Sequence, residues 1–208
     1  MTWDVLSAIG TVAFAISGAI VAMEEDYDIL GIYILGIVTA FGGGAVRNLL
    51  IGVPISALWS QGLLFQIALL SITCVFLFPQ ILLKHWNTWG NFTDAIGLSA
   101  FAIQGALYAV HMNHPLSAVV VAAVLTGSGG GIIRDMLAGR KPLVLKYEIY
   151  NVWAILGGFA IGLKLAKTPL ELYTLFVLLV SFRILSYKYK WKLPTRSIQQ
   201  MKNDQKGM

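Results

Sequence analysis

The chain has 208 residues, of which 57% are hydrophobic and only 12% are charged, and its mean hydropathy is +0.74. Because a soluble domain carries roughly 25% charged residues, this composition excludes an ordinary soluble fold and predicts an integral membrane protein. The formal net charge of +5 comes largely from residues 188–208. We interpret this segment as a basic tail at the membrane surface and not as a nucleic-acid-binding element.

Apolar stretches long enough to cross a bilayer recur along the chain. A transmembrane helix needs about 20 mostly apolar residues, and none of these stretches alternates in the way that a β-barrel strand does. The sequence therefore predicts an all-α membrane protein with seven transmembrane helices. The predicted spans are 3–23, 29–51, 60–83, 92–110, 115–138, 148–166 and 170–187.

The sequence repeats itself after 87 residues. Residues 8–52 align with residues 95–139 without a gap, with 17 identities in 45 positions. Each copy holds three spans, an odd number, so the second copy would enter the membrane from the opposite side, as in inverted-topology transport proteins. We predict a first three-helix repeat at 1–90, an inverted second repeat at 91–168, a seventh transmembrane helix at 169–188 and a basic cytoplasmic tail at 189–208.

A glycine triplet lies in the second span and again in the fifth. Each glycine costs about 1 kcal/mol relative to alanine inside a helix, and broken helices at matching positions of two inverted halves indicate a transport site. We therefore expect a kink or unwound turn at each triplet. The alternative is that the small residues only allow close helix packing. The residues concerned are Gly42, Gly43, Gly44, Gly129, Gly130 and Gly131.

An arginine follows each triplet, Arg47 in the first copy and Arg134 in the second. An arginine inside a membrane is costly and usually faces a cavity, although these off-centre positions also permit snorkelling to the interface. The next residue is Asn48 in one copy and Asp135 in the other. Because adjacent helical residues do not face each other, we expect Asp135 to pair with Arg47 across the pseudo-twofold axis.

Polar residues at repeat-related positions complete the predicted pore lining. Thr39 and Thr126 lie one turn before the triplets, and Ser17 and Gln104 occupy matching positions in the first and fourth spans. The alternative for a lone Ser or Thr in such a helix is a hydrogen bond to its own backbone.

Lysine and arginine in the short loops predict the orientation of the chain. With seven spans the two termini lie on opposite sides. The basic residues of the connections gather mainly on the side of the C-terminus, which predicts a cytoplasmic C-terminus and an outside N-terminus in a prokaryotic inner membrane. On that side fall Lys84, Arg140, Lys141, Lys146, Lys188, Lys190, Lys192 and Arg196, against Lys164 and Lys167 on the other.

Other chemistries lack the residues they need. No G-K-[ST] follows the glycines, as a phosphate-binding loop requires, and His111 and His114 have no Cys or carboxylate close in sequence with which to hold a metal. No Ser/His/Asp set or carboxylate pair lies at a common depth. We expect no enzyme activity, no cofactor and no metal site.

Two three-helix repeats that carry GGGxxRN and GGGxxRD, followed by a seventh helix, resemble the prokaryotic branch of the trimeric intracellular cation (TRIC) channel family over about residues 3–188. The resemblance implies a homotrimer with one pore per protomer that conducts monovalent cations, K⁺ above Na⁺. It also implies that the second and fifth spans are kinked at 42–44 and 129–131 and line the pore with Arg47 and Arg134. The same domain has been labelled a glycine transporter.

Two functions remain open from the residues alone. One is an ion channel, and the other is a secondary carrier for a small zwitterion such as glycine, since inverted repeats and paired broken helices suit both. An arginine would pair naturally with the carboxylate of such a substrate. No separate coupling-ion site is visible in the sequence, and this favours the channel.

Overall fold

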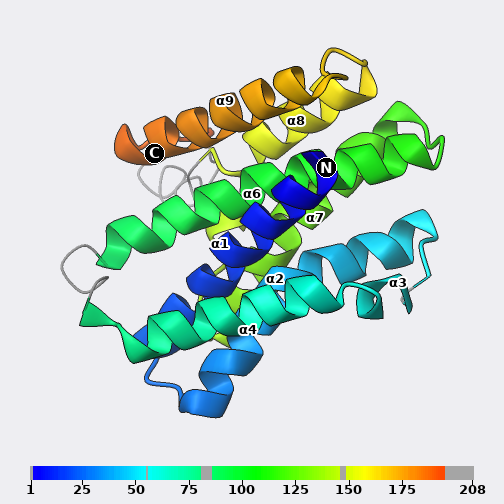
Figure 1. Cartoon of the computed structure of the whole chain (residues 1–208). Helices are drawn as coiled ribbons and strands as arrows, with labels where there is room; N and C mark the ends of the chain where they lie inside the picture. The colour runs from blue at the N-terminus through cyan, green and yellow to red at the C-terminus, as the bar shows by residue number, and fades with distance from the viewer. Residues whose placement is uncertain (1, 55, 81–85, 146–148, 195–208) are drawn as a thin grey trace, which may run out of the picture.

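The computed structural model describes residues 2–54, 56–80, 86–145 and 149–194, and all the statements below concern this part of the chain. It forms eight α-helices and one 3₁₀ turn and contains no strand there (Figure 1). The helices are α1 (Thr2–Glu24), α2 (Ile29–Ile51), α3 (Ser56–Trp59), α4 (Gly62–Leu77), α6 (Trp86–His111), α7 (Leu116–Leu137), α8 (Asn151–Gly162) and α9 (Pro169–Lys188), with η1 at Leu143–Leu145.

The all-helical membrane fold predicted from composition is confirmed. Five helices, α1, α2, α6, α7 and α9, are long and apolar enough to cross a bilayer. The predicted spans 60–83 and 148–166 correspond to the shorter apolar helices α4 and α8. Lys84, Lys146, Arg196 and the end of the basic tail lie outside the described residues.

Local sequence signals set the ends of the helices. Asp28 caps α2 by accepting a hydrogen bond from the Gly31 N–H at 2.8 Å, and Gly52 ends it with a positive φ of 77°. Thr168 and Glu171 form a capping box at the start of α9. These side chains satisfy backbone groups that a helix end leaves without partners.

The corresponding helices of the two repeats pack against each other in antiparallel pairs. Ser7 of α1 contacts Gln104 of α6, whereas Ser17 and Asp94 of the same two helices meet at the guanidinium of Arg134. Residue numbers therefore rise along α1 as they fall along α6, and Figure 1 shows these helices running in opposite directions. The closest contacts of α2 with α7 follow the same order, with position 39 opposite 130 and 43 opposite 126.

Both glycine triplets lie inside continuous α-helix, so of the expected kink or unwound turn at 42–44 and 129–131 the unwound turn is wrong, whereas a kink stays a prediction. The triplets instead let α2 and α7 touch through their backbones. A Cβ atom on Gly43 would lie 2.5 Å from the carbonyl oxygen of Thr126, and one on Gly130 would collide with the carbonyl oxygen of Thr39. Close packing by small residues, the alternative reading of the triplets, explains both.

The same type of contact joins the first two helices of each repeat. Gly18 faces the side chain of Thr39, and Gly105 faces that of Thr126. Each threonine hydroxyl donates to the carbonyl oxygen four residues earlier in its own helix, at 2.6 Å in both copies. Residues that match in the alignment of the two copies, 87 residues apart, therefore make matching contacts.

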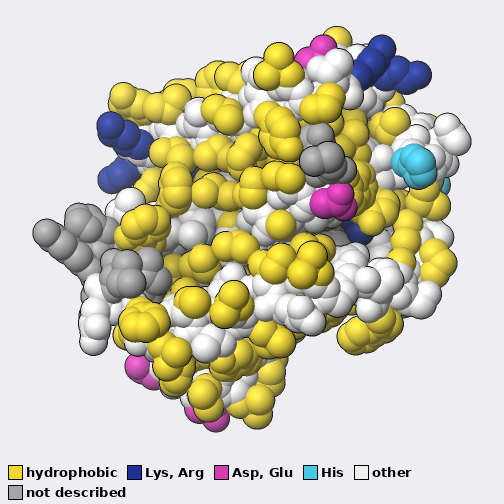
Figure 2. All heavy atoms as spheres, in the orientation of Figure 1, with side chains coloured by type: hydrophobic (Ala, Val, Ile, Leu, Met, Phe, Trp, Pro, Cys, Tyr) yellow, Lys and Arg dark blue, Asp and Glu magenta, His cyan; other side chains and the backbone are white. Residues whose placement is uncertain are grey.

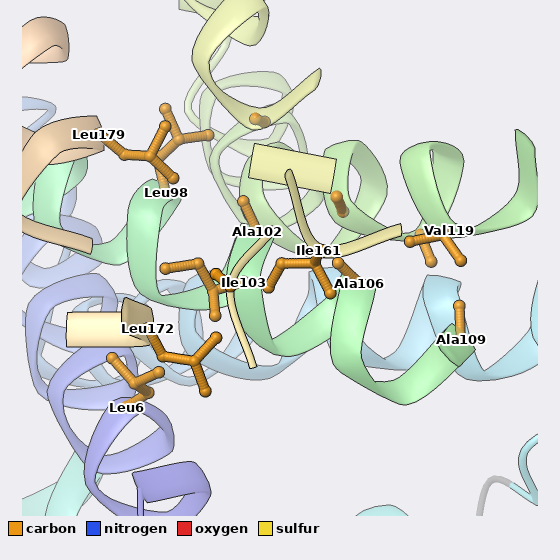
Figure 3. Close-up of a cluster of buried hydrophobic side chains, with 14 of the residues drawn as sticks. Leu6, Leu98, Ala102, Ile103, Ala106, Ala109, Val119, Ile161, Leu172 and Leu179 are labelled. Atoms are coloured by element: carbon orange, nitrogen blue, oxygen red, sulfur yellow. The ribbon is translucent and has the colours of Figure 1, made fainter. Parts of the chain in front are cut away.

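Apolar side chains hold α6 and α7 against α8 and α9. Leucine, isoleucine and alanine side chains of α1, α6, α7, α8 and α9 form one buried cluster, part of which Figure 3 shows. The outer surface is apolar as well. Figure 2 shows hydrophobic side chains over most of one face, with most lysine and arginine side chains near its ends, as a lipid-facing surface requires.

The contact between α2 and α7 generates a prediction about stability. Gly130→Ala places a methyl group against backbone and should destabilise the protein by about 2–3 kcal/mol. Gly44→Ala is the matched control, because a Cβ there meets only Nη2 of Arg47 at 3.7 Å. It should be neutral, or stabilising by up to about 1 kcal/mol through helix propensity. Thermal unfolding in detergent measures both, and equal shifts for the two variants would contradict the backbone contact.

Candidate functional site: two arginine cavities

Arg134 lies at the centre of a buried polar cluster. Its side chain is 2% exposed, and Nη1 donates to Asp94 at 2.8 Å and to the Ser17 hydroxyl at 2.6 Å. Its Nε and Nη2 both reach Oδ1 of Asp135 at 2.8 Å. One guanidinium thus connects α1, α6 and α7.

The two carboxylates of this cluster have further donors of their own. The Tyr150 hydroxyl donates to Asp94 at 2.6 Å, and the Leu143 N–H donates to Asp135 at 2.9 Å. The guanidinium of Arg183 lies over the Tyr150 ring, 4.5 Å from its centre. Buried charges are tolerated when they are paired and hydrogen-bonded in this way.

The predicted pairing of Asp135 with Arg47 is wrong, because Asp135 pairs with its own neighbour Arg134. The rule that adjacent helical residues do not face each other describes Cβ directions. An arginine side chain is long enough to bend its guanidinium back to the next residue. Asp135 lies in the last turn of α7. It also accepts a hydrogen bond from the backbone N–H of Leu143, the first residue of η1.

Arg47 occupies the matching position in α2 but has different surroundings. It is 2% exposed, and its Nε and Nη2 donate to Oδ1 of Asn48 at 3.0 and 2.7 Å. Its guanidinium carbon lies 4.0 Å from the centre of the Tyr108 ring. Nη1 is buried and has no hydrogen-bond partner among the described residues.

The two arginine sites differ in charge because of two substitutions between the repeats. Asp94 of the second copy corresponds to Ser7 of the first, and Asp135 corresponds to Asn48. Both replacements are uncharged, and Ser7 accepts a hydrogen bond from Gln104 at 2.5 Å. Arg134 is therefore compensated by carboxylates, whereas Arg47 has only neutral partners among the residues described.

A polar cavity of about 140 Å³ leads to Arg134 from one end of the helix bundle. We call it the Arg134 cavity. Loop residues at the ends of α1 and α7 form its mouth, and the Arg134 cluster forms its floor. Its lining comprises Ser17, Ile20, Val21, Glu24, Gly90, Asn91, Asp94, Arg134, Asp135, Arg140, Lys141 and Leu143.

A smaller cavity of about 20 Å³ lies beside Arg47. We call it the Arg47 cavity, and Arg47 is the only ionisable residue among the described ones that line it. It is lined by Thr11, Ala40, Phe41, Gly44, Arg47, Leu58, Gln61, Leu64, Phe101, Gln104 and Thr126.

The two cavities are separated by the contact between α2 and α7. Because these helices are antiparallel, the C-terminal halves that carry Arg47 and Arg134 point toward opposite ends of the bundle. Between them lie the backbone contact at Gly43 and Gly130 and the buried ring of Phe14, which packs edge-on against Phe101 with ring centres 5.3 Å apart. In the described part of the chain, a packed barrier thus separates the Arg134 cavity from the Arg47 cavity.

The other predicted lining residues fall in different places. Ser17 lines the Arg134 cavity, whereas Gln104 and Thr126 line the Arg47 cavity. Thr39 is fully buried against Gly18 and lines neither. The hydroxyls of Thr39 and Thr126 donate to their own helices.

Sequence reasoning missed three members of the Arg134 cluster. Asp94 and Arg183 are ionisable residues inside predicted spans, and this signal alone marks them as candidates for a functional site. Tyr150 carries no such signal, because a tyrosine near the end of a span is an ordinary interfacial residue.

A salt-bridge network closes the loops at the mouth of the Arg134 cavity. Arg140 donates to Glu24 at 2.6 Å and also to Glu25. Burial lowers the pKa of Arg140, but the hydrogen bonds and charges of the two glutamates outweigh it and raise the pKa above its ordinary value. These contacts place the acidic turn after α1 at the same end of the bundle as the basic loop after α7.

No cluster of three or more His, Cys, Asp or Glu side chains with the geometry of a metal site occurs in the described part of the chain. His114 lies within hydrogen-bond distance of the Ile51 carbonyl oxygen through Nε2, at 3.0 Å. This contact links the loop after α6 to the end of α2.

Comparison with known proteins identifies the family. A family model described as glycine transporter matches residues 4–80 and 91–165, which are the two repeats. The chain is 74% identical to the UPF0126 membrane protein YvgT of Bacillus subtilis over 199 residues, 96% of this chain and 98% of that protein.

Solved structures extend the likeness to the fold. A structure from work on conductance through TRIC cation channels is 37% identical, with a TM-score of 0.82 over 95% of this chain and 98% of that chain. The TRIC trimeric intracellular cation channel orthologue from Rhodobacter sphaeroides is 30% identical, with a TM-score of 0.83 over 90% and 98%. This chain belongs to the prokaryotic TRIC family. It is a multi-pass membrane protein, and the resemblance inferred from GGGxxRN and GGGxxRD is confirmed.

The difference between the two arginine sites of this TRIC-family protein predicts different mutational costs. Arg134→Gln leaves two buried carboxylates without their cation and should destabilise the protein by about 3–5 kcal/mol. Arg47→Gln removes a charge that faces only neutral groups and should cost less than about 1 kcal/mol. Thermal unfolding in detergent distinguishes the two variants. A larger loss of stability for Arg47→Gln than for Arg134→Gln would contradict the assignment of Arg134 as the arginine paired with carboxylates.

Proposed function

We propose that this protein is a monovalent cation channel whose pore runs between α1, α2, α6 and α7. The observation that carries the proposal is the likeness in both sequence and fold, over nearly the whole chain, to solved TRIC cation channels. The two polar cavities support it, because they reach toward the middle of the bundle from opposite ends.

The proposed topology has seven spans, formed by α1, α2, α4, α6, α7, α8 and α9. Residues 1–90 form one three-helix repeat, 91–168 its inverted copy, 169–188 the seventh helix and 189–208 a cytoplasmic tail. The antiparallel packing of α1 with α6 and of α2 with α7 supports inversion. From the distribution of basic residues, the N-terminus lies outside and the Arg134 cavity opens to the cytoplasm.

Cation preference has a physical basis in the Arg134 cavity. Carboxylates near a pore attract cations. At the floor of this cavity Asp94 and Asp135 share one guanidinium, whereas Glu24, Arg140 and Lys141 lie on the remainder of the lining. Arg134 bonds to both aspartates and to Ser17, and these bonds keep its guanidinium at the wall of the cavity. The order K⁺ above Na⁺ and the homotrimer with one pore per protomer follow from the family resemblance.

The packed barrier at Gly43, Gly130 and Phe14 corresponds to a closed pore in this proposal. Conduction requires α2 and α7 to separate at the glycine contact, or the Phe14 ring to move away from it. Since no side chain of the triplets interlocks the two helices, a small separation is enough to admit water between the cavities. Thr126 and Gln104 of the Arg47 cavity and Ser17 of the Arg134 cavity would then line one continuous ion path.

The alternative function is a secondary carrier for a small zwitterion such as glycine. The Arg134 cavity presents a guanidinium beside carboxylates, which match the carboxylate and ammonium groups of an amino acid. The description of the matching family model agrees with this chemistry.

Purified protein in a planar bilayer under a KCl gradient tests the proposal. A channel gives unitary current steps and a reversal potential near the K⁺ equilibrium potential. Absence of steps, together with uptake of labelled glycine into proteoliposomes of the same preparation, would instead establish the carrier. Native mass spectrometry of that preparation gives its stoichiometry.

The role of the buried carboxylates yields a sharper prediction. Asp94→Asn keeps the shape of the side chain but removes its charge, and a unit charge about 5 Å from an ion contributes roughly 1–3 kcal/mol. K⁺ conductance should fall at least fivefold. Asp28→Asn is the control, because it makes the same change at an exposed helix cap where asparagine serves equally well. Equal K⁺ conductance of the two variants would show that Asp94 does not contribute to the ion path.

A further inference from the structure

Arg47 has an unused hydrogen-bond donor in a buried position. Its Nε and Nη2 are satisfied by Asn48, but Nη1 is buried and has no partner among the described residues. Buried polar atoms are almost always hydrogen-bonded, and the unmet donor here belongs to a permanent cation. A group that accepts a hydrogen bond and carries negative charge would satisfy both requirements.

The partners that Arg47 contacts in the described part of the chain are all neutral. None of the residues that line the Arg47 cavity is acidic, and the closest side-chain partners are an amide and the face of the Tyr108 ring. The repeat-related Arg134 has two carboxylates at 2.8 Å. Matching positions of α2 and α7 thus hold two different arginines. Arg134 has carboxylate partners, whereas Arg47 has none among the described residues.

The cavity beside Arg47 has the size and lining of a site for a small ion. Its volume of about 20 Å³ is enough for one water molecule or a single-atom ion. Thr11, Gln61 and Gln104 bring O–H and N–H groups to its wall. Such groups donate to an anion as readily as they bind water.

We propose that the Arg47 cavity binds one small monovalent anion of the halide class, chloride under physiological conditions, beside the guanidinium of Arg47. The anion takes the place that Asp94 and Asp135 fill in the second repeat and neutralises the guanidinium. In the channel proposed above, it would also remove a positive charge that repels passing cations. This consequence rests on the proposed function, whereas the binding site itself does not.

The repeat provides a matched variant. Asn48→Asp gives the first copy the residue that Asp135 provides in the second. A carboxylate at this position would bond Nε and Nη2 of Arg47 as Asp135 does for Arg134, and would neutralise the charge without an anion. The variant should therefore lose its response to halide, as Arg47→Gln should.

The first experiment is thermal unfolding of the full chain in detergent. Sodium gluconate is replaced stepwise by sodium chloride at constant ionic strength, because gluconate is too large for the cavity. We expect the wild-type Tm to rise by about 2–4 °C up to about 150 mM chloride and then to saturate. Asn48→Asp and Arg47→Gln should show no rise, and Asn48→Asp should start from a higher Tm in gluconate.

The second experiment locates the ion directly. Crystals of the wild-type protein grown in bromide should show an anomalous peak beside Nη1 of Arg47 and none beside Arg134. A Tm that is insensitive to chloride, a rise shared equally by Asn48→Asp, or the absence of the bromide peak would overturn the proposal. Neither readout measures ion flux, so failure of the channel hypothesis would leave both results interpretable.

Discussion

The backbone contact between α2 and α7 is the constraint on which the rest of the structure depends. Gly43 and Gly130 bring the two helices so close that no side chain fits between them. This contact fixes the antiparallel pair at the middle of the bundle and directs the C-terminal halves with their arginines toward opposite ends. It also separates the two cavities. A membrane protein gains little from burying apolar surface between helices, so such close packing supplies much of its cohesion.

Two repeats that make matching packing contacts produce two electrostatically different sites. The glycine contacts and the threonine hydrogen bonds recur in both copies with the same geometry. Replacement of Asp94 and Asp135 by Ser7 and Asn48 changes only the charge around the arginine. The packing shared by the two copies thus holds the pseudo-symmetric frame, while the described groups beside the two arginines differ, with two carboxylates beside Arg134 and neutral groups beside Arg47.

The expectation of unwound turns and that of an Arg47–Asp135 pair failed for a common reason. Both applied a rule for an isolated helix to a helix in contact with others. A glycine triplet weakens a lone helix, but here the neighbouring helix packs into the space that the missing side chains leave. Adjacent side chains diverge at Cβ, but an arginine is long enough for its guanidinium to reach the next residue, and it does so in both copies, at Asn48 and at Asp135.

The sequence by itself determined the membrane class, the helical fold, the 87-residue repeat and the family, because these follow from composition, periodicity and motif identity along the chain. It also marked Arg47, Arg134 and Asp135 as residues of interest. Only the tertiary structure decided which groups meet. Asp94 of α6, Tyr150 before α8 and Arg183 of α9 are far apart in the chain, and their approach to Arg134 depends on the packing of four helices. Side-chain pairing is set by distances in space, and no local pattern encodes them.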